Sequence, residues 1–314
     1  MSAVLQPHPQ PIEVHPQSAH IGAEIRGVDL SQPLPAEQVS AIRQALLQWK
    51  VVFFRDQPLS HEQQVAFAAQ FGEPTVGHPV FGFEPDHPAV YSVGRNRKKA
   101  RFSGPSVVRP WSGWHTDVTA AVNPPWGSIL RGVTIPPYSG DTQWTNLAVA
   151  YRELSEPLRN FVDGLRGLHR FAAPAGSQSL ALFEEKTARR PLLTEHPLVR
   201  VHPETGEKSL LISPTFLQSI VGLAPRESQV LLELLFEHSL RPEFTVRFKW
   251  EPGSVAFWDN RATAHLAPQD IFATEFDRQL YRVTLGGVPP IGPDGRASVA
   301  LEGDPITSAA AHRE

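Results

Sequence analysis

A histidine and an aspartate two residues apart, His115 and Asp117, form the first pattern in this sequence that could do chemistry. Successive side chains of a β-strand point to opposite faces, so residues i and i+2 share one face. If this segment is a strand, the imidazole and the carboxylate can therefore reach the same metal ion. A single His-x-Asp is weak support, because short patterns also arise by chance.

Two similar patterns occur elsewhere, at His202-Pro203-Glu204 and at His312-Arg313-Glu314. The first lies in HPETGEK, whose Pro and Gly are typical of a hairpin turn, and the second ends the chain. His115 instead leads into SILRGVTI, which resembles a strand. This context favours His115 and Asp117 over the other two pairs.

A third ligand must come from a distant part of the chain, and His265 is the candidate, because it follows the strand-like run SVAFWD. Two histidines and one carboxylate on one face of an octahedron leave three positions open, which suits a non-haem Fe(II) oxygenase. Zinc hydrolases are the chemical competitor, but the sequence has no His-Glu-x-x-His motif. The chain also has no Cys, so thiolate ligands, disulfides and iron–sulfur clusters are excluded.

Arg278 and Arg282 follow, four residues apart. On a strand both would face the same side, and two inward-facing cations are costly unless they meet anions. Arginine binds carboxylate or sulfate through a planar fork of N–H groups. A dicarboxylate cosubstrate and an anionic substrate would together satisfy the pair.

The elements that must position these residues are mostly strands. Helical spacing predicts a helix over 35–49, a buried strand follows at 51–54, and Ser60 with Gln63 forms a capping box for a helix that ends near Ala69. From Gly127 onward short strand-like runs recur, interrupted by helical stretches near 147–165 and 225–238. The pattern predicts a β-rich α+β fold, a β-sandwich or jelly roll with helical cover.

The 314 residues suffice for one large catalytic domain, expected at 13–290, between a flexible tail at 1–12 and a loosely ordered C-terminal tail at 291–314. A loop at 82–113, with a basic stretch at 95–101, is either a solvated loop or a lid over a ligand. The net charge of −3 with 19% charged residues does not indicate nucleic acid or a membrane as partner. We expect a cytoplasmic location by default, since no secretory signal is apparent.

Several motifs together resemble the taurine dioxygenase (TauD/TfdA) family of Fe(II)- and 2-oxoglutarate-dependent dioxygenases. They are WHTDVT at 114–119, GDTQWTN at 140–146, and WDNR at 258–261 with His265, Arg278 and Arg282. The likeness extends from about residue 14 to 289, and EHPLVRVHPETGEKSLL at 195–211 especially resembles the bacterial alkylsulfatase branch. It implies a double-stranded β-helix, Fe(II), 2-oxoglutarate as cosubstrate and O₂.

The resemblance also implies roles for single residues, with His115, Asp117 and His265 at the positions of the iron ligands. The other matched positions are Thr142 and Arg278 for the distal carboxylate of 2-oxoglutarate, His78 and Arg282 for the substrate's sulfonate or sulfate, and Val118 for the pocket beside the iron. Residues 109–113 and Phe81 depart from taurine dioxygenase and favour a larger or more apolar substrate than taurine. His169, His196 and His238 have no partner pattern and are interpreted as structural.

The expected reaction is hydroxylation of a small anionic organic substrate. An alkyl sulfate ester or sulfonate would release sulfate or sulfite plus an aldehyde, with succinate and CO₂ from the cosubstrate. Two alternatives remain open: a hydroxylase or desaturase of a carboxylate-bearing metabolite or aryloxyalkanoate, and a non-catalytic 2-oxoglutarate sensor. The family likeness further suggests a homo-oligomer, either a dimer or a tetramer.

Overall fold

The computed structural model describes residues 11–95, 109–172 and 180–312. The expected N-terminal tail and the basic centre of the expected lid therefore lie largely outside the described residues. Within the range 82–113, the described part includes strand β4 (Tyr91–Arg95), which joins the edge of the main sheet. Among the described residues, every helix is too short or too polar to cross a lipid bilayer.

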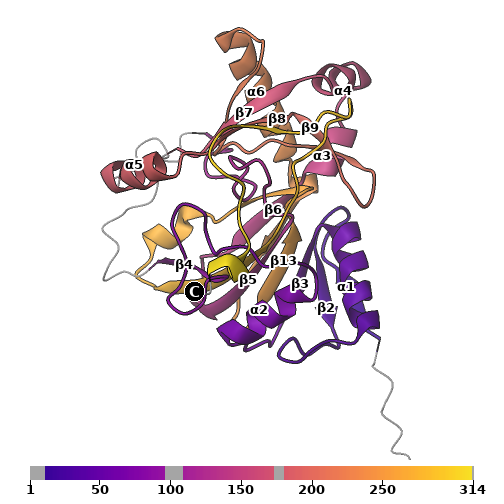
Figure 1. The fold of residues 1–314 in the computed structure, drawn as a ribbon. Coiled ribbons are helices and arrows are strands. Elements are labelled where there is room, and N and C mark those ends of the chain that lie inside the picture. Colours follow the sequence, from indigo (N-terminus) through magenta and orange to yellow (C-terminus); the bar gives the residue numbers. More distant parts are fainter. Residues whose placement is uncertain (1–10, 96–108, 173–179, 313–314) are drawn as a thin grey trace, which may run out of the picture.

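A seven-stranded sheet forms the lower part of the molecule (Figure 1) and runs in the order β1-β2-β3-β13-β5-β15-β4. All neighbours are antiparallel except β2 and β3, which are parallel. Besides β4, its strands are β1 (Glu13–Pro16), β2 (Ala23–Arg26), β3 (Val51–Phe54), β5 (Gly127–Thr134), β13 (Val255–Asp259) and β15 (Arg278–Leu285).

A three-stranded antiparallel sheet packs against one face of this sheet, in the order β12-β6-β14. Its strands are β6 (Thr142–Asn146), β12 (Thr245–Phe248) and β14 (Thr263–Leu266). Large buried side chains fill the space between the sheets; among them, Phe53 stacks on Phe248 at 4.1 Å, and Trp144 and Trp258 meet edge to face. Both tryptophans are core residues.

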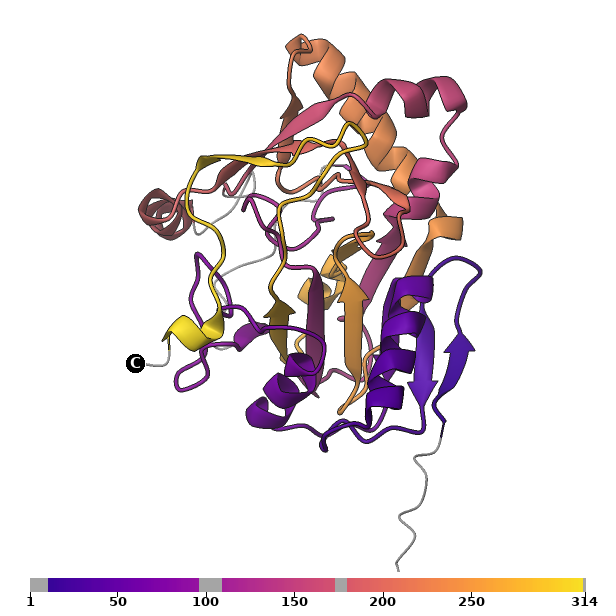
Figure 2. The same ribbon diagram turned by 45° about the vertical axis from the view of Figure 1, so that its right-hand side comes forward.

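Two helices cover the opposite face of the seven-stranded sheet, and Figure 2 shows α1 (Ala36–Trp49) lying along its strands. Helix α2 (His61–Ala69) begins at the predicted capping box, in which Ser60 Oγ accepts from the N–H of Gln63 and the Gln63 side chain accepts from the N–H of Ser60. The sequence thus predicted both helices and the buried strand β3 within one or two residues.

The upper part of the molecule holds two smaller sheets, β11-β7-β8-β16 and the pair β9-β10. Their strands are β7 (Arg166–Arg170), β8 (Leu193–Pro197), β9 (Val199–Val201), β10 (Lys208–Leu210), β11 (Leu217–Ile220) and β16 (Val299–Glu302). The β9–β10 connection is the HPETGEK hairpin that the sequence predicts, with Gly206 at φ 73° in its turn.

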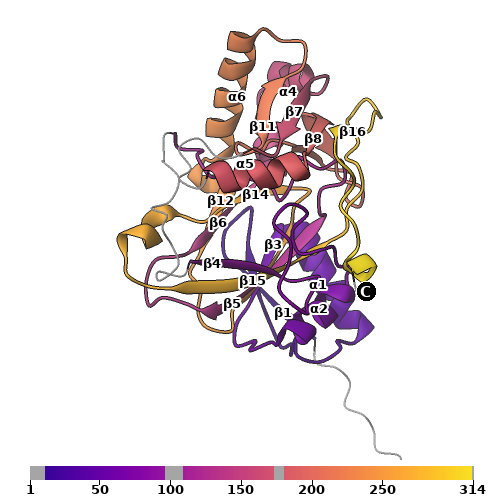
Figure 3. The ribbon, with the colours of Figure 1, turned by 60° about the vertical axis from the view of Figure 1, so that its left-hand side comes forward.

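Helices α3 (Leu147–Arg152), α4 (Glu156–Val162) and α6 (Pro225–Ser239) pack on these sheets through a second apolar cluster. Figure 3 shows α6 beside β11, and α5 (Leu180–Arg189) on the outside. Helices α3, α4 and α6 occupy the two predicted helical stretches, whereas α5 was not predicted. Short 3-10 turns η1 (Pro242–Phe244), η2 (Gln269–Ala273) and η3 (Ala309–His312) complete the elements.

The C-terminal segment differs from the loosely ordered tail expected at 291–314. Strand β16 pairs with β8, and Thr75 and Ser308 form an antiparallel bridge. Ile306 and Ala309 are buried against the rest of the protein. Strand β16 has only 4 residues, and so short a run of alternating side chains does not predict strand pairing from the sequence.

Candidate metal centre

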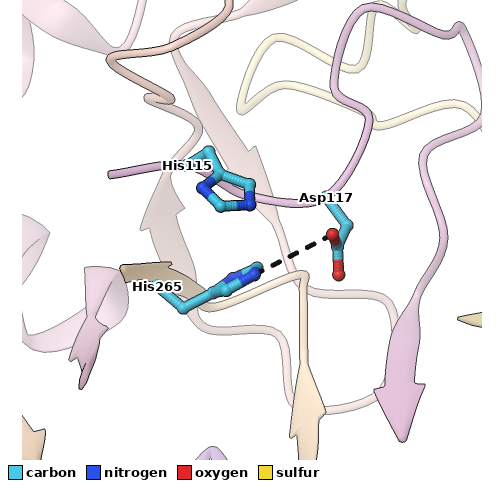
Figure 4. Close-up of side chains that lie close together, drawn as sticks. All are labelled: His115, Asp117 and His265. Atoms are coloured by element: carbon cyan, nitrogen blue, oxygen red, sulfur yellow. Dashed lines mark ion pairs between the residues drawn. The ribbon is translucent and has the colours of Figure 1, made fainter. Parts of the chain in front are cut away.

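His115, Asp117 and His265 lie together in the structure, with one ligand atom of each within 4.8 Å of the others (Figure 4). His115 and His265 face each other as an antiparallel bridge, with N–H···O distances of 2.9 and 2.7 Å in the two directions. Their ring centroids are 4.2 Å apart. Backbone pairing across about 150 residues of sequence therefore brings the two imidazoles side by side.

The path from His115 to Asp117 differs from the expected strand. Only His115 makes a bridge, and the chain turns directly after Thr116. Val118 has φ 46°, a conformation that is rare for a β-branched residue and marks a strained turn. Asp117 therefore reaches the same point as His115 because of this turn and not because of strand alternation.

The protonation states of the three residues suit a divalent metal ion. Burial lowers the pKa of His115, and burial together with the nearby His115 ring lowers the pKa of His265 to about 3, so both imidazoles are neutral at pH 7. The Nδ1 of His115 lies 2.9 Å from the carbonyl oxygen of Gly113, to which it can donate, so its Nε2 is the nitrogen left for a metal.

Asp117 is a buried carboxylate with several partners. Burial opposes its ionisation, but Arg282 and the two histidines, together with a hydrogen bond from Ser128, hold its pKa below the usual value. Ser128 Oγ donates to Oδ2 of Asp117 at 2.6 Å, and Arg282 forms an ion pair with Oδ1. Two neutral imidazoles and one ionised carboxylate form the donor set of a 2-His-1-carboxylate centre, so these residues fit Fe(II).

Arg278 of β15 and Thr142 of β6 lie next to each other, one on the seven-stranded sheet and one on the three-stranded sheet. Thr142 Oγ1 accepts hydrogen bonds from Trp250 Nε1 at 3.0 Å and from Arg278 at 3.3 Å. Arg278 is buried, its Nε has no hydrogen-bond partner among the described residues, and burial lowers its pKa to about 10. A cation in this state fits an anionic ligand, since a buried charge without a partner is costly.

Arg282 lies on the same face of β15 as Arg278, as strand alternation predicts: residues 278, 280 and 282 are buried, and 279 and 281 less so. Its Nε has no partner among the described side chains, and its guanidinium lies 5.4 Å from the centroid of the Tyr91 ring. The direct ion pair with Asp117 was not predicted from the sequence. Arg282 therefore reaches one of the candidate metal ligands directly, and not only the space beyond Arg278.

His78 is buried near this point and is neutral. Burial, with a smaller effect of Arg282, lowers its pKa to about 3. Its Nδ1 accepts from the backbone N–H groups of Val80 and Phe81, each at 3.1 Å. The remaining nitrogen, Nε2, therefore carries the hydrogen and is a donor.

An apolar cluster lies beside His78. Phe81 and Phe171 contact the His78 ring, and Val118, Phe171 and Phe216 are members of one buried cluster. Trp111, in the stretch that departs from taurine dioxygenase, instead packs against Phe236 of α6. The structure thus brings His78, Val118 and Phe81 together, but assigns Trp111 to the helical core.

Sequence reasoning missed several side chains around the centre. Ser128 binds Asp117 directly, but a serine in a buried strand carries no motif. Lys186 of α5 lies 5.5 Å from the centroid of the Phe81 ring, and α5 itself was not predicted. His169 and His196 contact Thr119 from β7 and β8, at 3.0 Å and 2.7 Å, which agrees with their interpretation as structural residues.

Comparison with known proteins gives one consistent result. The model of the family "Taurine catabolism dioxygenase TauD, TfdA family" matches residues 13–284. The chain is 42% identical to the alpha-ketoglutarate-dependent sulfate ester dioxygenase of Pseudomonas putida, covering 93% of this chain and 95% of that protein. It is 37% identical to the alkylsulfatase of Acinetobacter baylyi, covering 94% and 91%.

A solved structure agrees as well. The crystal structure of a taurine dioxygenase from Burkholderia xenovorans superposes with a TM-score of 0.83 at 65% identity, and the match covers 96% of this chain and 99% of that one. The residues of the candidate centre all lie within the range 13–284 that the family model matches.

Proposed function

The chain belongs to the TauD/TfdA family and is an Fe(II)- and 2-oxoglutarate-dependent dioxygenase, and on this premise we propose that it oxidises organic sulfate esters or sulfonates. The observation that carries the proposal is the pair of buried arginines on one face of β15, each with an unpartnered Nε among the described residues. One would bind the cosubstrate and the other the substrate's anionic group. The names of the two curated relatives support sulfate esters as the substrate class.

In this proposal His115, Asp117 and His265 would hold iron. When bound, iron would supply the oxidising chemistry by which 2-oxoglutarate and O₂ give succinate, CO₂ and a hydroxylated substrate carbon. Arg278 and Thr142 hold the distal carboxylate of 2-oxoglutarate. The guanidinium supplies the charge, and the Thr142 hydroxyl, which accepts from both Trp250 and Arg278, can donate its own hydrogen to the carboxylate.

The substrate's sulfate or sulfonate would lie between Arg282 and His78. Arg282 provides positive charge, and His78, neutral with its hydrogen on Nε2, provides a neutral donor. Lys186 on α5 adds a further cation near Phe81. These groups place the anionic end, while Val118, Phe81 and the adjoining apolar cluster contact the hydrocarbon part and exclude water.

The products follow from where the hydroxyl group is added. If the carbon bearing a sulfate ester is hydroxylated, its C–O bond to sulfate breaks, the new hydroxyl loses its proton, and an aldehyde and sulfate result. A sulfonate reacts likewise at its C–S bond and gives an aldehyde and sulfite. The protein contributes placement of the C–H bond and of the anion.

The finer architecture belongs to the same proposal. The facing sheets β1-β2-β3-β13-β5-β15-β4 and β12-β6-β14 support a double-stranded β-helix, in which strand β14 carries His265 of the metal centre. We take the chain from residue 13, with the C-terminal segment that packs on it, as a single catalytic domain, the parts of 82–113 that flank β4 as its lid, and the enzyme as a cytoplasmic dimer or tetramer. Light scattering of the purified protein tests the oligomeric state.

The decisive experiment is a substrate panel measured under O₂ with Fe(II) and 2-oxoglutarate. Linear and branched alkyl sulfates, alkyl sulfonates, aryloxyacetates and aliphatic carboxylates are scored for substrate-dependent succinate and for released sulfate or sulfite. Succinate formed with matching sulfate or sulfite supports the proposal. Succinate formed only with carboxylates would assign the enzyme to the carboxylate alternative, and no substrate-dependent succinate with any compound would favour the 2-oxoglutarate sensor.

A further inference from the structure

A buried chain of hydrogen bonds ends on Asp117 and begins in the core of the protein. Trp258 Nε1 donates to Oδ1 of Asn260 at 2.9 Å, and Asn260 Nδ2 donates to Ser128 Oγ at 2.8 Å. Ser128 Oγ then donates to Oδ2 of Asp117 at 2.6 Å. All four residues are at most 2% exposed, so water does not compete for these bonds.

The indole N–H of Trp258 determines which group donates and which accepts in each of these three hydrogen bonds. An indole N–H can only donate, so the oxygen of the Asn260 amide must face Trp258. The amide nitrogen then faces Ser128 and occupies a lone pair of its hydroxyl oxygen. The hydroxyl hydrogen of Ser128 remains for Asp117, which always receives it.

The sheet register fixes the positions of these groups. Ser128 of β5 and Trp258 of β13 are direct partners across the antiparallel pair, so both side chains share the inner face of the sheet. Asn260 follows β13 and is held by its backbone N–H, which donates to the carbonyl oxygen of Trp126 at 2.9 Å. Asp117 therefore receives a hydrogen bond from a rigid part of the sheet, although it lies in a turn.

The two oxygens of Asp117 consequently differ. Oδ2 accepts from Ser128, whereas Oδ1 forms the ion pair with Arg282, lies 3.9 Å from Nε2 of His265 and faces the other candidate ligands. We propose that Ser128 and Asn260 are positioning residues for the metal centre, which hold Asp117 so that Oδ1 alone binds the metal. This inference rests on the proposed role of Asp117 as a ligand.

The number of oxygens through which Asp117 binds the metal determines how many coordination positions of the metal stay open. A carboxylate that binds through both oxygens occupies two positions, and one that binds through a single oxygen occupies one. If Asp117 binds the metal through one oxygen, then His115, Asp117 and His265 together would leave three positions of an octahedron open. Three positions would suffice for O₂ and for a keto acid that binds through two oxygens. Holding Oδ2 away thus preserves the position that O₂ needs.

The first test uses the change Ser128→Ala, in which Asp117 loses its donor. We expect the affinity for Fe(II), and for Co(II) as a redox-stable probe, to fall roughly 10- to 100-fold. The charge-transfer absorption band of the anaerobic Fe(II)–2-oxoglutarate complex should also shift, because the electron donation of Asp117 changes. Ser128→Thr keeps the hydroxyl and should restore both properties.

A matched control is Ser209→Ala in β10. Ser209 is equally buried, but its hydroxyl makes only a long 3.4 Å contact with the carbonyl oxygen of Leu210. This change should leave metal affinity and the absorption band as in the wild type. Thermal unfolding of each metal-free variant verifies that its fold is retained.

The second test asks whether Asn260 acts through Ser128. Asn260→Ala should weaken metal binding less than Ser128→Ala, because the Ser128 hydroxyl can still reach Asp117. The double variant should bind metal no more weakly than Ser128→Ala alone, since nothing remains for Asn260 to orient. Additive losses would overturn the proposed chain.

The failures of this inference and of the proposed function can be told apart. If the wild type binds Fe(II) and Asp117→Ala abolishes binding, the metal site stands. Unchanged affinity and an unchanged band in Ser128→Ala would then refute only the positioning role. If Asp117→Ala binds metal like the wild type, the proposed centre itself fails, and the positioning role fails with it.

Discussion

Replacing Arg278 by alanine should weaken 2-oxoglutarate binding strongly while leaving the metal site intact. Arg278 is buried, has an unpartnered Nε among the described residues, and shares a hydrogen bond with Thr142. Loss of a charge-assisted pair in such a place costs on the order of 3 kcal/mol. At about 1.4 kcal/mol per factor of ten, the dissociation constant should rise roughly a hundredfold.

The conservative change Arg278→Lys should give an intermediate loss. Lysine keeps the positive charge but lacks the planar fork with which arginine can hold a carboxylate and contact Thr142 together. The neighbouring Arg247 provides a control, because it forms ion pairs with Asp141 and Asp270 at 2.7 and 3.0 Å and its side chain is 48% exposed. Arg247→Ala should change the dissociation constant less than twofold or threefold, as expected for surface pairs.

The assay is an anaerobic titration of 2-oxoglutarate into the Fe(II)-loaded protein, followed by the charge-transfer absorption band. A parallel titration with Co(II) measures metal affinity without the cosubstrate. If Arg278→Ala binds 2-oxoglutarate as the wild type does, another cation holds the distal carboxylate, and the assignment of the two arginines on β15 is wrong. A loss of metal affinity as well would mean that the change had disturbed the centre itself.

Three further predictions concern the same region. Each of the variants Asp117→Ala, His115→Ala and His265→Ala should lose Fe(II) binding and turnover while keeping the circular dichroism spectrum of the wild type. Near-wild-type turnover in one of them would show that the replaced residue is not a metal ligand. Arg282→Ala should raise the KM for the anionic substrate and increase succinate formed per oxidised product, with 2-oxoglutarate affinity nearly unchanged; if neither KM nor coupling changes, Arg282 does not anchor the anion. Burial lowers the pKa of His196 from 6.5 to about 3, so the imidazole stays neutral in the folded protein. The unfolded chain takes up a proton at this residue below pH 6.5, and the free energy of unfolding therefore decreases as the pH falls. Between pH 7.5 and pH 5, urea unfolding should show the metal-free wild type losing about 2 kcal/mol more than His196→Gln; equal losses would contradict the buried neutral state.

The sequence by itself predicted the local elements and the candidate metal ligands. Helical spacing and the Ser60 capping box predicted α1 and α2, because these signals act within one or two turns of helix. His115, Asp117 and His265 could be found because the donor types that a metal accepts are few. Strand alternation likewise predicted that Arg278 and Arg282 share a face.

Only the tertiary structure decided how these groups meet. The turn at Val118, and not a strand, directs Asp117 toward the histidines. The ion pair of Arg282 with Asp117 depends on how β15 packs beside that turn, and the bond from Ser128 depends on the register of β5 with β13. Contacts between residues that lie far apart in the chain follow from sheet pairing and core packing, which no local pattern of residue types encodes.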